Sequence, residues 1–234
     1  NDGGWGGITD PANSIHISMT SRDLEGEWTE AAGGPGNPYA DMAELEAGSP
    51  GGVSGATTNT AIAFWPGEHR VAPDSLARAI QAGMRIEACS DEESTLSLTE
   101  PSGDHEGSLI TLDGNDEALA GVSVTLSNFA LSTTSSHPII TVSNLASLEF
   151  DELNLTGSGL ASLVVLNNTT EATISNTTLN DGLHALSITD STVTLDNVNI
   201  VGSTVAGVWT TGPVTGLTMN NVTVSNTVPG LGVV

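Results

Sequence analysis

The sequence predicts an all-β fold, a parallel β-helix or solenoid in which each turn of the chain adds one rung to a stack. Two observations support this prediction. From about residue 86, short segments rich in Val, Ile, Leu and Thr alternate with Asn, Ser, Asp and Gly, and the segments recur at a regular spacing without an intervening helical pattern. A repeat of about two dozen residues made of strands alone is typical of a β-solenoid.

Five segments of this repeat superimpose without gaps, and their first residues lie 24, 24, 21 and 24 residues apart. Strand alternation places the first and third residues of each segment inward, two polar residues then form a turn, and the sixth and eighth residues point inward again. Each rung is therefore expected to bend sharply between two strands. The segments are Val124–Leu131, Leu148–Leu155, Ala172–Leu179, Val193–Ile200 and Leu217–Val224.

The second turn residue is asparagine in four of the five segments and Glu152 in the other. Asparagine tolerates the left-handed backbone conformation of such a bend better than most residues other than glycine. Rungs stack about 4.8 Å apart, so the side-chain amides can bond to one another along the column. We expect a structural ladder of Asn128, Asn176, Asn197 and Asn221.

The aligned segments and the asparagine turn resemble the right-handed parallel β-helix superfamily, also called pectate-lyase-like. In character they are most similar to the repeats of bacterial surface proteins and autotransporter passenger domains. The resemblance covers about residues 105–234 and implies a right-handed coil. It is specific for the fold and leaves the function open.

The remaining chain is expected to form an irregular N-terminal cap. Residues 1–60 are rich in Gly and Pro, with one credible strand at Ser14–Met19. Residues 61–104 are expected to hold the cap and the first rungs, with a strand at 61–65 and a short helix at 74–82. Residues 105–234 then supply rungs of about 21–24 residues.

The composition excludes several partners. The chain has 28 acidic residues, four arginines and no lysine, for a formal net charge of −24. Nucleic acid and anionic membranes are therefore poor partners, and no stretch is long and apolar enough for a membrane span. No Lys or Arg follows Arg85, so the repeat cannot supply the cationic base that the resemblance to pectate lyases would imply.

An acid pair on an outward strand face leaves one enzymatic alternative, a polysaccharide-processing glycoside hydrolase. Such enzymes need two carboxyl groups roughly 5 Å apart for retention or 6.5–9.5 Å apart for inversion. The register offers Glu149 with Glu171 on neighbouring rungs, and Asp151 with Asp196 two rungs apart. Solvent-facing acids are also expected in a chain this acidic, so whether the chain is an enzyme stays open.

Calcium is the one cofactor that the sequence suggests. The loop Asp113, Gly114, Asn115, Asp116 and Glu117 carries four oxygen donors and a glycine between two predicted strands. It resembles part of a calcium loop without matching the twelve-residue pattern, and a plain polar insertion is the simpler interpretation. We expect no other cofactor.

The favoured function is a non-catalytic, secreted protein of the extracellular space or cell surface, acting as an adhesin or a filament. The last motif ends at Val224, and the next rung is incomplete, so either the sequence is a fragment of a longer solenoid or another subunit completes the open end. An open rung is a template for further strand pairing. The expected partner is therefore the protein itself, in a head-to-tail homo-oligomer, or a surface glycan, with neither nucleic acid nor membrane insertion.

Overall fold

A computed structural model describes residues 107–117, 119–121, 123–212 and 216–225, and five short strands of the preceding chain. Every regular element among these residues is a β-strand, and every strand pairing is parallel. The chain is therefore an all-β parallel solenoid, as the repeat predicts. The helix expected at residues 74–82 lies outside the described residues.

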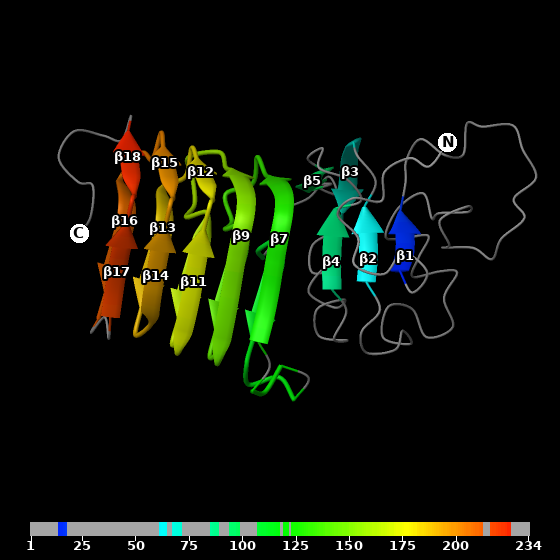
Figure 1. The fold of residues 1–234 in the computed structure, drawn as a ribbon. Coiled ribbons are helices and arrows are strands. Elements are labelled where there is room, and N and C mark those ends of the chain that lie inside the picture. Colours follow the sequence, from blue (N-terminus) through cyan, green and yellow to red (C-terminus); the bar gives the residue numbers. More distant parts are fainter. Residues whose placement is uncertain are drawn as a thin grey trace, which may run out of the picture.

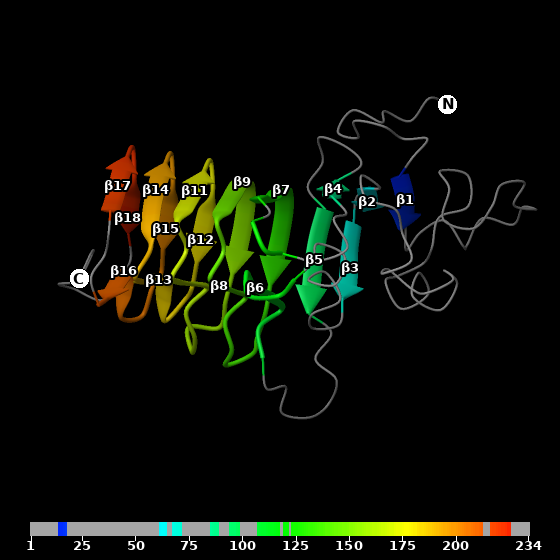
Figure 2. The same cartoon turned by 90° about the horizontal axis from the view of Figure 1, so that it is seen from below.

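The solenoid has two sheets that run the length of the stack (Figures 1 and 2). The first is a 5-stranded sheet of one strand per rung. Its strands, in order, are β6 (Ile110–Asp113), β8 (Ile140–Ser143), β10 (Val164–Asn167), β13 (His184–Thr189) and β16 (Ala206–Thr211).

The second is a 10-stranded sheet that bends within each rung, at the turn that the repeat predicts. In two rungs a single strand passes through the bend, and in the next three the rung divides into two strands there. These rungs are β7 (Ser123–Ser132), β9 (Ser147–Thr156), β11 (Glu171–Ser175) with β12 (Thr178–Asn180), β14 (Thr192–Asp196) with β15 (Asn199–Val201), and β17 (Gly216–Asn220) with β18 (Thr223–Ser225).

The strand register confirms the gapless alignment of the five segments. Val124 pairs with Leu148, Leu148 with Ala172, Ala172 with Val193, and Val193 with Leu217. The 21-residue spacing between the third and fourth segments leaves this column intact. This rung is shorter than the others only in the connections between its strands, and the paired strands keep their register.

Parallel stacking begins before residue 105. Strands β3 (Gly67–Val71) and β5 (Ser94–Leu98) precede β7 in the bent sheet. Strands β1 (Ser14–Ile17), β2 (Ala61–Phe64) and β4 (Arg85–Ala88) form a separate parallel sheet, and β4 contacts β7. The strands expected at 14–19 and 61–65 are thus present with slightly shorter bounds.

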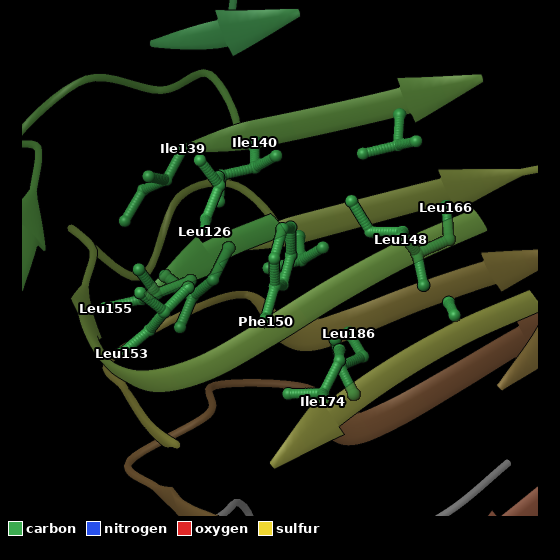
Figure 3. Packing of buried hydrophobic residues seen from close by; sticks show 14 of the residues in the cluster. Leu126, Ile139, Ile140, Leu148, Phe150, Leu153, Leu155, Leu166, Ile174 and Leu186 are labelled. Carbon is green, nitrogen blue, oxygen red and sulfur yellow. The ribbon is translucent and has the colours of Figure 1, made fainter. Parts of the chain in front are cut away.

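The core consists of inward side chains stacked rung upon rung (Figure 3). Phe150, Ile174 and Leu195 occupy one column and are each 0% exposed. Burial of such a side chain stabilises the fold by about 1.5–3 kcal/mol. Because every rung buries its apolar residues against the rungs on both sides, a rung at an end of the stack is only half covered.

The turn in the bent sheet has the predicted left-handed backbone. Residues Glu152, Asn176, Asn197 and Asn221 have φ values of 53°, 48°, 56° and 49°. A second column of left-handed residues follows the strands of the 5-stranded sheet, and the sequence analysis did not single it out. It contains Asn144, Asn168, Asp190 and Gly212, with φ values of 58°, 51°, 49° and 76°.

Candidate assembly surface and the predicted site residues

Hydrogen bonds join three of the predicted ladder asparagines. The Nδ2 group of Asn221 donates to Oδ1 of Asn197 over 2.9 Å, and Asn197 donates in the same way to Asn176 over 2.8 Å. Asn176 donates in turn to Oδ1 of Asp151 over 2.8 Å, so Glu152 is bypassed. The side chain of Asn128 lies outside the described residues.

A second amide ladder lies at the other column of left-handed residues. Asn168 donates to Oδ1 of Asn144 over 2.8 Å, and Asn144 donates to Oδ1 of Asp113 over 2.9 Å. Each ladder therefore begins on an aspartate that only accepts, and each donor points toward the preceding rung. The sequence signal for this second ladder was the recurrence of Asn144 and Asn168 24 residues apart.

The predicted calcium loop takes part in this ladder. Oδ1 of Asp113 accepts the backbone N–H of Asn115 over 3.0 Å as well as the amide of Asn144. The hydrogen bond from Asn144, followed by that from the Asn115 backbone, holds the pKa of Asp113 below its usual range. Asn115, Asp116 and Glu117 are exposed. Within the described residues, no three His, Cys, Asp or Glu side chains gather as a metal site.

The structure places the four candidate carboxylates on the outward face of the bent sheet. Glu149 pairs with Thr173 and Glu171 pairs with Ser147, so the two acids are diagonal neighbours. Asp151 and Asp196 share a column, with Ser175 between them. Asp151 accepts hydrogen bonds from Ser175 Oγ over 2.7 Å and from Asn176, which makes it the anchor of a ladder.

An aromatic pair lies on the outer surface of the 5-stranded sheet. The rings of His184 and Trp209 stack with their centroids 5.3 Å apart. Ser162 Oγ lies 3.0 Å from Nδ1 of His184, and burial lowers the pKa of this histidine, which favours the neutral ring. Both rings are half-buried, so Trp209 packs on the outer face of this sheet and not in the core. The two residues are 25 positions apart in sequence, and only rung stacking brings them together.

The last described rung leaves its apolar side chains partly uncovered. Met219 is 36% exposed, whereas Leu195, its counterpart in the preceding rung, is 0% exposed. The other inward residues of the two rungs differ in the same direction. In the preceding rung Val193, Val198 and Ile200 are buried, while Leu217, Val222 and Val224 are only partly buried.

The same rung has no charge. Residues 197–234 contain no Asp, Glu, Lys, Arg or His, although residues 1–196 carry all 28 acidic residues. In a chain this acidic, an uncharged stretch of this length is unusual, and a second acidic molecule would meet less electrostatic repulsion there. We call strands β16, β17 and β18 the uncharged end rung. The absence of charge in residues 197–234 is visible in the sequence, but it matches no chemical motif.

Comparison with known proteins gives no relative. No family model matches the chain, and it has no significant match among curated proteins or solved structures. Among the described residues there is no helix of the length and hydropathy needed to cross a membrane.

Proposed function

We propose that this protein is a non-catalytic, extracellular or cell-surface β-solenoid that assembles end to end, as a filament or an adhesive fibre, through the uncharged end rung. The coil is inferred to be right-handed, since crossovers between parallel strands are right-handed in nearly all proteins. The single observation that carries the proposal is the contrast between the 36% exposed Met219 and the fully buried Leu195 one rung earlier.

Strand edges support the same conclusion. Strands β16, β17 and β18 each pair with one neighbour, in the preceding rung, among the strands that the structure describes. Their other edges offer backbone N–H and C=O groups in the pattern that a parallel strand would satisfy. A further rung would bond to these groups and cover Met219 and its neighbours, just as each rung covers the one before it.

Charge favours assembly at this end and disfavours contacts elsewhere. The faces of the solenoid carry outward acids such as Glu149, Glu171 and Asp196, so side-by-side contacts between two copies would be repulsive. The end rung has none of these charges. Association is therefore directed along the axis, which gives an open head-to-tail chain.

The test compares two substitutions at exposed apolar residues. Met219→Glu places a carboxylate in the end rung, and Leu160→Glu places one at a residue that is 65% exposed on an inner rung. We expect concentration-dependent oligomers of the natural protein in sedimentation velocity, and filaments in electron microscopy. Met219→Glu should abolish both, because a buried, unpaired charge is strongly unfavourable at an interface, and Leu160→Glu should leave both intact.

Two outcomes would contradict the proposal. One is a natural protein that stays monomeric at all concentrations and salt conditions. The other is equal assembly of the natural protein and the Met219→Glu variant, which would place the contact elsewhere. Circular dichroism of each variant would establish that the solenoid is folded, so that loss of assembly is not loss of structure.

A further inference from the structure

The solenoid carries several copies of the triplet that accepts an N-linked sugar in secreted proteins, Asn-x-Ser or Asn-x-Thr. The chain contains five such triplets, and the asparagine of each is at least partly exposed. The five asparagines are Asn154, Asn167, Asn168, Asn176 and Asn221. The contacts of each side chain decide which of them has room for a sugar in the folded protein.

Three of these asparagines hold the amide ladders. The Nδ2 groups of Asn168, Asn176 and Asn221 each donate to a side chain of the preceding rung over 2.8–2.9 Å. Nδ2 is also the atom to which an N-linked sugar is joined. Stacked rungs lie about 4.8 Å apart, so a sugar at any of these positions would separate the stacked side chains and break the ladder.

A fourth asparagine, Asn154, is also held against a neighbouring rung. Its Oδ1 accepts the side-chain amide of Asn180 over 3.0 Å. Its amide group therefore takes part in a contact between rungs, as those of the ladder asparagines do.

Asn167 differs from the other four. It ends β10, where the inward Val164 and Leu166 are each 0% exposed and Asn167 lies on the outward face. No described residue forms a hydrogen bond with its side chain. Its neighbours in the same outward column are the small residues Ser143 and Thr189. A sugar on Asn167 can therefore point into solvent without displacing another side chain.

The position of Asn167 also suits the proposed assembly. Strand β10 is the middle strand of the 5-stranded sheet, so a sugar there leaves the uncharged end rung uncovered. Asn221, by contrast, follows β17 within that rung, and a sugar on it would obstruct the assembly surface. The five strands of the sheet carry one acidic residue, Asp113 in the first strand, so their outward face offers mainly hydroxyl groups to a neutral sugar.

We propose, resting on the extracellular location proposed above, that Asn167 is the acceptor of an N-linked glycan. In the transfer, a bond forms between Nδ2 of Asn167 and C1 of a sugar that is carried on a lipid-linked phosphate donor. The C1–O bond to the phosphate breaks, and Nδ2 loses one proton. Thr169 supplies the hydroxyl residue of the triplet, and its Oγ1 lies 3.5 Å from the backbone oxygen of Asn167.

Mass spectrometry of glycopeptides tests the site. The natural protein is purified from the secreted fraction of the organism that makes it, and peptides that span the five triplets are analysed. We expect hexose or hexosamine masses on Asn167 and on none of the ladder asparagines. Asn167→Gln should remove the sugar. The matched control is Thr170→Ala at an exposed residue, which destroys the overlapping triplet of Asn168 and keeps that of Asn167, so the sugar should remain.

Several results would overturn this inference. One is secreted protein with no sugar on Asn167. Another is a sugar that survives Asn167→Gln and is lost in Thr170→Ala, which would place it on Asn168. Equal modification of Asn167, Asn176 and Asn221 would show that contacts between rungs do not select the site.

Sedimentation velocity of the same preparations separates this inference from the proposed assembly. Oligomers of a protein without sugar on Asn167 would overturn the glycan site alone. A glycosylated protein that stays monomeric at all concentrations would contradict the end-to-end assembly alone. Absence of the protein from the secreted fraction would overturn both the extracellular location and the glycan site.

Discussion

Asn176 is the side chain whose removal tests the amide ladder most directly. Its Nδ2 donates to Asp151, its Oδ1 accepts from Asn197, both over 2.8 Å, and its φ of 48° is left-handed. Asn176→Gly removes both hydrogen bonds and keeps the backbone conformation accessible. Asn176→Ala removes the same bonds and adds left-handed strain.

The magnitude follows from the two bonds. A neutral hydrogen bond contributes about 0.5–1.5 kcal/mol net, and one to a charged group about 1.5–3 kcal/mol. Asn176 is exposed, so water replaces part of the lost bonding, and the lower ends of these ranges apply. We therefore expect Asn176→Gly to lower the free energy of unfolding by about 2 kcal/mol, and Asn176→Ala by about 1 kcal/mol more, because of strain.

Urea unfolding followed by circular dichroism measures these losses, at a concentration below that of assembly. Because a solenoid can unfold rung by rung, the slope of each transition is compared as well as its midpoint. Asn199→Ala is the control, since this exposed asparagine of the next rung makes no side-chain hydrogen bond to the described residues. An Asn176→Gly protein as stable as the control would refute the stabilising role of the ladder.

Two further predictions concern the second ladder. Asp190 follows Asn168 in the second column of left-handed residues, but an ionised carboxylate cannot donate a hydrogen bond to the amide oxygen of Asn168. Asp190→Asn is therefore expected to extend the ladder by one hydrogen bond and to raise the free energy of unfolding by about 0.5–1.5 kcal/mol. An unchanged urea midpoint would show that no such bond forms. The pKa of Asp113 is depressed in the folded state, so its contribution to stability is present above the unfolded pKa of about 3.9 and is lost as pH falls through the folded value. Asn144→Ala removes the largest cause, and NMR titration should then show a higher Asp113 pKa.

The repeat could be aligned from sequence because its physical signal is strong. Inward positions such as Leu148, Phe150 and Leu195 must be apolar to stack, and the residue at the bend must tolerate a left-handed backbone. Both requirements therefore produce a pattern of residue types that repeats with every rung. The alignment carries directly into the strand register. The sequence pattern of the second ladder is less regular, because Asp190 and Gly212 interrupt the column of asparagines that begins with Asn144 and Asn168.

The candidate site residues were harder to interpret from sequence, because the same residue type serves chemistry and structure. Asp113 and Asp151 were singled out as a metal ligand and a catalytic acid. In the structure, both anchor amide ladders by accepting hydrogen bonds from asparagines one rung later. Sequence places an acid on an outward column, but only the neighbouring rung reveals which donor faces it.

By itself, the sequence determined the repeat, the strand register, the left-handed turn and the absence of charge in residues 197–234. These properties are local or periodic, so each can be read one segment at a time. Only the tertiary structure decided which side chains meet across rungs, such as His184 with Trp209, and which apolar residues remain uncovered, such as Met219. Exposure is a property of neighbours along the stack, and a residue at an end of the stack has the same sequence pattern as one in its interior.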